Sequence, residues 1–111
     1  MATRAPRRTG GPGLFHPDLQ DVTLDQALRA LGDPVRLSIV RALAASAVPM
    51  PCHAFDLGVT KSTTTHHFRV LRESGIISQY DKGTARLSEL RRADLAERFP
   101  GLLEAVLIAG P

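Results

Sequence analysis

The stretch KSTTTHHFRVLRESG, residues 61–75, decides the fold because its apolar residues recur with the period of an amphipathic helix. The inward side of that helix is predicted to hold Thr64, Phe68, Leu71 and, at its border, His67. The outward side then holds Thr63, Thr65, His66, Arg69 and Arg72. Ser62 is expected to cap the helix and Gly75 to end it in the left-handed conformation. A helix that begins with so many hydroxyl and imidazole groups is suited to contact a ligand.

Two helices are predicted upstream. Thr23 and Gln26 form a capping-box pattern, and apolar residues at helical spacing follow until Gly32. Asp33 is a good cap and Pro34 a good first residue for a second helix, which runs to Ala45. The second of these helices is expected to be mostly buried and central to the fold.

The segment before residue 61 predicts the first half of a helix-turn-helix. Residues 48–51 contain two prolines and are expected to be a loop. A short helix over residues 52–57 follows, and Gly58 ends it. A short helix, a tight turn and a longer helix with a polar start make a helix-turn-helix, whose second helix enters the DNA major groove.

A β-hairpin is predicted after that motif. Residues 76–80 and 84–87 are strand-like, and Asp81-Lys82-Gly83 between them is a turn. A hairpin in this place is the wing of a winged helix. The expected fold is therefore mainly α with a small β-hairpin wing.

Length and composition limit the organisation. The 111 residues allow about one small domain. Residues 1–14 are rich in arginine and glycine and are expected to be a flexible basic arm, while residues 15–111 form the folded domain. The single cysteine excludes an internal disulfide, and no apolar run predicts a signal peptide or membrane span, so a cytoplasmic protein is expected. The formal net charge of +3 is a mild hint of an anionic partner.

Three segments carry a family resemblance: LGDPVRLSIVRAL at 31–43, TKSTTTHHFRVLRESGII at 60–77, and the DKG hairpin. In order and spacing, over about four fifths of the chain, they resemble the ArsR/SmtB family of winged helix-turn-helix transcriptional regulators. The resemblance implies a homodimeric repressor that binds operator DNA and releases it when a metal ion or another effector binds.

The residue types support DNA contacts without that resemblance. Hydroxyl and imidazole groups can bond base edges, threonine methyls can meet thymine methyls, and cations can bind phosphates. The expected DNA-binding residues are Lys61, Ser62, Thr63, Thr65, His66, Arg69, Arg72, Lys82 and Arg86. The alternative is a merely solvated helix face, for which serine and threonine are poor choices.

A second surface is predicted near the end of the chain. A helix between Pro100 and Gly110 is apolar over more of its circumference than one core contact could hide. Packing this helix and the first helix against a twofold partner would bury the excess. The expected dimer interface consists of Leu24, Leu28, Leu102, Leu103, Val106 and Leu107. A helix buried within the monomer is the alternative.

The effector site is less clearly marked. The resemblance implies metal ligands just before an Asp-Leu pair, but here those two positions hold His53 and Phe55, so the usual thiolate pair is absent. No histidine follows His67, which removes the imidazoles of a C-terminal site. Cys52 and His53, joined by His16 or Asp18, remain a mixed set that suits Ni, Zn, Co or Cu. The alternative makes Cys52 an ordinary small buried residue, His53 a surface residue and His16 a residue of the N-terminal tail.

Other functions receive less support. No nucleophile with an adjacent base, Gly-rich phosphate loop or paired acids predicts an enzyme. Two alternatives to a metal-responsive repressor stay open: a winged helix that docks a partner co-regulator, and a redox or small-molecule sensor of the same fold.

Overall fold

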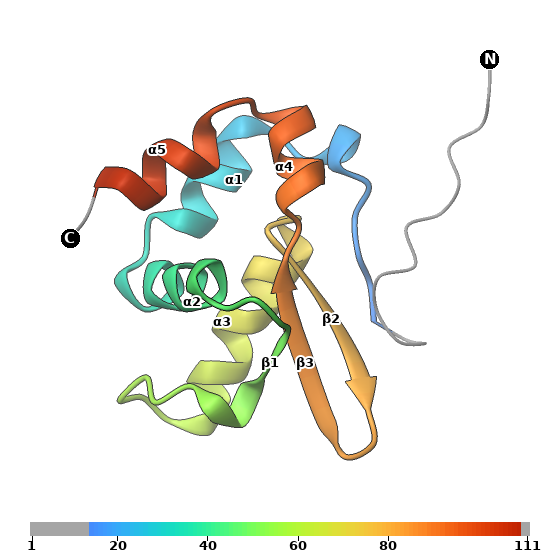
Figure 1. Ribbon diagram of the computed structural model, residues 1–111, viewed down its shortest axis with the longest axis vertical. Helices are drawn as coiled ribbons and strands as arrows, with labels where there is room; N and C mark the ends of the chain where they lie inside the picture. The colour runs from blue at the N-terminus through green and yellow to red at the C-terminus, as the bar shows by residue number, and fades with distance from the viewer. Residues whose placement is uncertain (1–13, 110–111) are drawn as a thin grey trace.

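The computed structural model describes residues 14–109, so the expected basic arm lies outside the described residues except for Leu14. The chain forms helices around a small sheet (Figure 1). In chain order the elements are η1 (Leu19–Asp21), α1 (Leu24–Leu31), α2 (Pro34–Ala45), β1 (Met50–Pro51), η2 (Cys52–Ala54), α3 (Lys61–Glu73), β2 (Ile77–Lys82), β3 (Ala85–Leu90), α4 (Arg92–Arg98) and α5 (Leu102–Ala109).

The first two helices begin where their caps predict. The Thr23 hydroxyl accepts a hydrogen bond from the Gln26 amide at 3.2 Å. The Asp33 carboxylate accepts from the amides of Val35 and Arg36 at 2.9 and 3.0 Å. Each side chain satisfies backbone donors that the first turn of a helix leaves without partners.

The segment between α2 and α3 differs from the prediction. Residues 50 and 51 are not loop: they form β1, which pairs antiparallel with β3 and places Met50 opposite Ser88. Proline is tolerated there because β1 is an edge strand of the sheet. The expected helix over residues 52–57 is only the single 3₁₀ turn η2. Phe55 is already extended and packs its ring edge-on against Phe68, 5.3 Å between centroids, which draws the chain out of helical geometry.

The hairpin is present, with its turn shifted along the chain. The sheet has the order β1-β3-β2, and the hairpin register runs from Ile77 opposite Leu90 to Lys82 opposite Ala85. The turn is therefore Gly83-Thr84, not the expected residues 81–83. Gly83 has φ 63°, a conformation that glycine adopts without the steric cost of a side chain.

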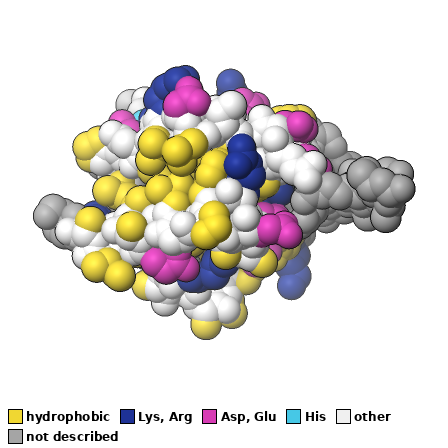
Figure 2. All heavy atoms as spheres, turned by 90° about the horizontal axis from the view of Figure 1, so that it is seen from above, with side chains coloured by type: hydrophobic (Ala, Val, Ile, Leu, Met, Phe, Trp, Pro, Cys, Tyr) yellow, Lys and Arg dark blue, Asp and Glu magenta, His cyan; other side chains and the backbone are white. Residues whose placement is uncertain are grey.

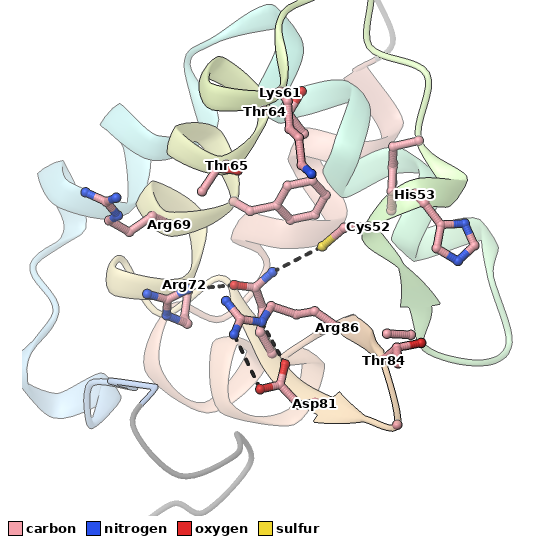
Figure 3. A pocket seen from close by; sticks show the side chains of 15 residues that line it. Cys52, His53, Lys61, Thr64, Thr65, Arg69, Arg72, Asp81, Thr84 and Arg86 are labelled. Atoms are coloured by element: carbon pink, nitrogen blue, oxygen red, sulfur yellow. Dashed lines mark hydrogen bonds and ion pairs between the residues drawn. The ribbon is translucent and has the colours of Figure 1, made fainter.

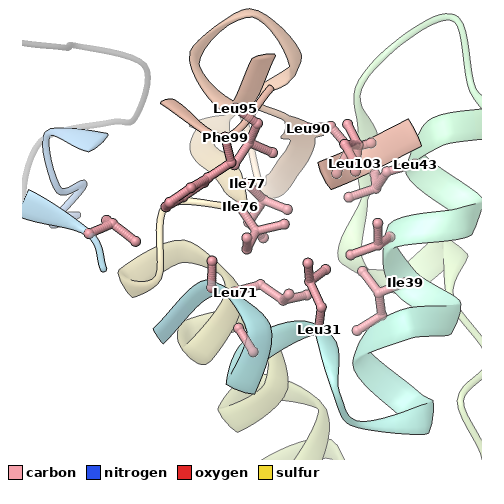
Figure 4. Packing of buried hydrophobic residues seen from close by; sticks show 14 of the residues in the cluster. Leu31, Ile39, Leu43, Leu71, Ile76, Ile77, Leu90, Leu95, Phe99 and Leu103 are labelled. Carbon is pink, nitrogen blue, oxygen red and sulfur yellow. The ribbon is translucent and has the colours of Figure 1, made fainter. Parts of the chain in front are cut away.

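The core lies where α1, α2, α3 and the sheet meet (Figure 4). Ile39, Leu71, Ile76 and Ile77 are completely buried in it. Gly75 ends α3 with φ 77°, and a Cβ there would lie 3.0 Å from the Leu19 side chain. Glycine is thus required both by the backbone conformation and by the close approach of the N-terminal segment.

Two arginines, Arg91 and Arg98, hold that N-terminal segment in place. Arg91 is 5% exposed and donates to the Pro17 carbonyl at 2.8 Å, and Arg98 donates to the carbonyls of Leu19 and Val22 at 3.0 Å. Charge-assisted hydrogen bonds of this kind are stronger than neutral ones. The chain before α1 is thereby held against α4.

The molecule has two dissimilar ends. The start of α3, η2 and the hairpin tip lie at the lower end of Figure 1, while α1, α4 and α5 lie at the upper end. Seen from above, the upper end shows a gathering of hydrophobic side chains (Figure 2). No helix in residues 14–109 is long and apolar enough to cross a membrane.

Candidate nucleic-acid interface

The start of α3 is organised by Thr60. The Thr60 hydroxyl accepts from the Thr63 amide at 3.2 Å, so Thr60 caps α3 in place of the expected Ser62. It also bonds the Thr63 hydroxyl at 2.9 Å and lies 3.3 Å from that of Ser62. Thr60 is the N-cap because its backbone is still extended, as a cap requires, whereas Ser62 is already helical.

The outward side of α3 presents most of the expected side chains to solvent. Lys61, Ser62, Thr65, His66 and Arg69 are exposed, and Thr63 is half-buried. Together they give a cation, hydroxyls and an imidazole within the first turns of one helix. This combination can donate to and accept from base edges and phosphates.

Arg72 does not join them. Its side chain is only 12% exposed, its Nη1 donates to Gln79 Oε1 at 2.7 Å, and its Nε donates to the Phe15 carbonyl at 3.2 Å. Burial also lowers the pKa of the Arg72 guanidinium from its ordinary value. The expectation of an outward phosphate contact is wrong for this conformation, because β2 and the N-terminal segment supply acceptors that the helical pattern could not reveal.

The two wing cations have different surroundings. Lys82 is exposed beside the hairpin turn. Arg86 donates to both carboxylate oxygens of Asp81, at 2.9 and 3.4 Å, across the hairpin. That hydrogen bond lowers the pKa of Asp81. Arg86 is still 43% exposed, so its guanidinium keeps a free edge for an anion.

His67, expected at the border of the inward side of the helix, has a structural role. It is buried, and its Nδ1 lies 3.2 Å from Arg36 Nη1 and 3.8 Å from Asp33 Oδ2. These partners stand on and before α2, so His67 joins the two helices. His66, one residue earlier, faces solvent.

The proposed metal donors do not form a site. Among the described residues no three His, Cys, Asp or Glu side chains are arranged to hold a metal ion. Both ring nitrogens of His16 have hydrogen-bonding partners. Nε2 accepts a hydrogen bond from the backbone N–H of Gln79 at 3.0 Å, and Nδ1 lies 3.2 Å from the Leu14 carbonyl oxygen. His53 is exposed, and Asp18 caps η1. The set of Cys52, His53 and His16 therefore does not fit a transition metal in this structure.

Cys52 lies instead in a hollow between η2, α3 and the wing (Figure 3). Its sulfur is half-buried and accepts a long contact of 3.7 Å from Gln79 Nε2. Burial raises the pKa of the thiol, so it is neutral at neutral pH and poorly nucleophilic.

Gln79 is the site residue that sequence reasoning missed. It is 1% exposed, and its side chain contacts Arg72, Ser88 and Cys52. Its backbone N–H donates to His16 Nε2. The available signal was a polar residue in the middle of a predicted strand. Its partners come from four separate segments, so the network could not be inferred from spacing.

The residues of the predicted dimer interface divide into two groups. Leu24 and Leu28 are 50% and 46% exposed on α1, while Leu102, Val106 and Leu107 on α5 are half-buried. Leu103 is 8% exposed and belongs to the core, so the monomer already uses it. Ile108, which was not predicted at the interface, is 83% exposed.

The helices α2 and α3, joined through β1 and η2 and followed by the β2–β3 hairpin, have the arrangement of the winged helix-turn-helix class, and the polar start of α3 lies at one end. A helix-turn-helix domain family matches residues 31–80, which span α2, α3 and most of β2. The uncharacterised HTH-type transcriptional regulator YceK of Bacillus subtilis is 30% identical over 83 residues, 73% of this chain and 83% of the relative. The uncharacterised HTH-type transcriptional regulator MJ1325 of Methanocaldococcus jannaschii is 33% identical over 60 residues, 53% of this chain and 67% of the relative.

The chain belongs to the family of HTH-type transcriptional regulators. It is accordingly a DNA-binding transcriptional regulator, and its membership points away from an enzyme.

Proposed function

We propose that this regulator is a homodimeric repressor of the ArsR/SmtB type, acting in the cytoplasm on operator DNA. One observation carries the proposal: an exposed polar helix start beside a cationic wing lies at the opposite end of the molecule from an exposed apolar face. The first surface suits DNA and the second suits another copy of the chain.

The base-reading role falls to the start of α3. Thr65 and His66 are exposed, whereas the hydroxyl groups of Ser62 and Thr63 lie within hydrogen-bonding distance of Thr60. Thr65 and His66 are therefore best placed to discriminate between base pairs in the major groove. Lys61, Arg69, Lys82 and Arg86 position the protein on phosphates.

The dimer is proposed from the apolar face formed by α1 and α5. A monomer of 12.0 kDa has little surplus core with which to cover Leu24, Leu28 and Ile108. A twofold axis through this face leaves both α3 starts free at the far end of each subunit. Two such helices could then bind neighbouring half-sites about 34–36 Å apart.

The effector that would release DNA is not defined by a metal-ligand set, since the three predicted donors do not converge. A response to Ni, Zn, Co or Cu remains a prediction that metal titration can test. The arrangement of the described residues favours a small organic effector.

A gel shift on the upstream region of the chain's own gene tests the function. We expect the wild-type dimer to prefer this DNA to a scrambled duplex by about 1000-fold. Thr65→Ala and His66→Ala should each reduce that preference by about tenfold, because each removes a base contact of about 1–3 kcal/mol.

The matched control is Gln20→Ala, an exposed polar side chain on η1 at the upper end of the molecule. It should leave the preference unchanged. Equal binding of both duplexes by the wild type would refute operator recognition and favour a module that docks a partner protein. Added metals, a chelator or an oxidant in the same assay test the effector class.

A further inference from the structure

The hollow between η2, α3 and the wing has a volume of about 900 Å³. This is within the usual size range of small-molecule sites, which is about 300–1000 Å³. It lies beside the start of α3, and Figure 3 shows its lining side chains converging from three separate elements. The question is what remains available in it after the protein has satisfied its own polar groups.

Several polar side chains of the hollow are already paired. Gln79 Oε1 accepts from Arg72, and Gln79 Nε2 donates to Ser88 Oγ at 3.0 Å. Asp81 is paired with Arg86 on the wing. A ligand therefore gains little by offering further amide-like or hydroxyl groups to this floor.

The floor that is left is apolar. Phe55 and Phe68 form an edge-to-face pair, and the half-buried Cys52 lines the same hollow. The thiol is neutral because burial raises its pKa, so it adds no charge. Flat apolar groups bind well against such a surface.

The rim that is left is cationic. In the described part of the chain, Lys61 and Arg69 make no hydrogen bond or ion pair, and both line the hollow. The Lys61 side chain is directed into it (Figure 3). Arg86, on the facing strand, keeps part of its guanidinium exposed. The unpaired charge of the hollow is positive.

We propose that this hollow binds a small organic anion, with a flat apolar body against Phe55, Phe68 and Cys52 and a carboxylate or similar group at Lys61, whose side chain is directed into the hollow. A DNA phosphate could reach the rim but has no apolar body to fill the floor. The hollow is thus the effector site of the regulator.

This inference rests on the proposed function in one respect. Lys61, Thr65, Arg69 and Arg86 line the hollow and also belong to the expected DNA surface. One anion cannot occupy those cations while a phosphate does. The ligand therefore releases operator DNA by direct competition, without a rearrangement of the dimer.

Calorimetric titration of the full chain with 2-naphthoate, in the absence of DNA, tests the site. We expect saturable binding with a Kd of about 1 mM or tighter. The neutral isostere 2-naphthamide should bind about fivefold more weakly, and so should 2-naphthoate to Lys61→Gln, because each change removes one ion pair. Cys52→Leu places a larger side chain on the floor and should abolish binding.

Lys82→Gln is the matched control, because Lys82 is a wing cation that does not line the hollow. It should bind 2-naphthoate like the wild type. Circular dichroism of Cys52→Leu checks that the variant is folded, and Lys61→Gln changes only an exposed residue. In the gel shift, 2-naphthoate should release operator DNA at about fivefold lower concentration than 2-naphthamide.

The outcomes separate the two proposals. If the protein binds operator DNA but calorimetry detects no binding of 2-naphthoate, the proposed effector site is overturned and the proposed repressor function is kept. Binding that ignores Lys61→Gln and Cys52→Leu also overturns it, since the ligand would then sit on another surface such as the α1 and α5 face. Binding of 2-naphthoate without operator binding keeps the site and removes the proposed function.

Discussion

The two ends of the molecule expose different kinds of side chain. The lower end, with the start of α3 and the wing, keeps its polar groups facing outward. The upper end, with α1 and α5, exposes Leu24, Leu28 and Ile108, which water solvates poorly. The first is suited to a charged partner and the second to an apolar one. One small core thus presents a polar surface at one end and an apolar surface at the other.

The largest effect should come from introducing a charge into the exposed apolar surface at the upper end. Leu28→Glu changes a side chain that is 46% exposed in the monomer, so the subunit should still fold. A carboxylate buried at a twofold interface is strongly unfavourable, and we expect monomers in sedimentation experiments. Operator affinity should fall about 100-fold or more because the two half-sites are no longer linked.

Val48→Glu is the control for that change. Val48 is 67% exposed in the loop after α2 and is outside the proposed interface. It should sediment as the wild type does. A Leu28→Glu protein that remains dimeric would place the interface elsewhere.

A second variant separates the two ends of α3 itself. Arg72→Gln removes the donor to the buried Gln79 Oε1 and the bond to the Phe15 carbonyl. An unsatisfied buried acceptor costs about 1–3 kcal/mol, so the free energy of unfolding should fall by that amount. Chemical denaturation measures it. Unchanged stability would mean that Arg72 leaves this network in solution.

Arg69→Gln, one turn earlier on the helix, should show the reverse pattern. Arg69 is exposed and makes no internal bond in the described part of the chain, so stability should hold. Operator affinity should fall about tenfold, and the slope of log affinity against log salt should drop by about 1 as one phosphate contact is lost. Gel shifts at several salt concentrations give both values. An unchanged slope would remove Arg69 from the DNA surface.

The smallest effect is expected for a variant in α2, which belongs to the core that connects the two ends. Asp33→Ala removes the cap of α2 and should lower the free energy of unfolding by about 1 kcal/mol, while Asp33→Asn should cost less. The Arg36 amide, followed by the charges of Arg36 and His67, lowers the pKa of Asp33 below its ordinary 3.8. A carboxylate with a lowered pKa stabilises the fold above 3.8 and loses that contribution as pH falls through its folded value.

Denaturation of the wild type and of Asp33→Asn below pH 4 checks this sign. The wild type should lose its advantage over the variant as Asp33 is protonated. A constant difference across that window would show that the carboxylate charge contributes nothing.

Prediction from sequence succeeded where the signal was local. The caps at Thr23 and Asp33, the helix over residues 61–73 and the glycine after it are each set by neighbouring residues. It failed at residues 50–57, where pairing with β3 and the contact between Phe55 and Phe68 replace a helix with a strand and one 3₁₀ turn. Those partners are distant in sequence, so no periodicity reports them.

The sequence by itself determined the class of the protein: the order of its main helices and hairpin, and a polar start on the helix over residues 61–73. Only the tertiary structure decided which side chains remain available. It turned Arg72 inward, buried Leu103 in the monomer, gave the three metal-donor candidates no arrangement that could hold a metal ion, and formed a hollow beside Lys61. Helical periodicity assigns a residue to a face, but contacts between distant segments determine whether that face is covered, paired or free.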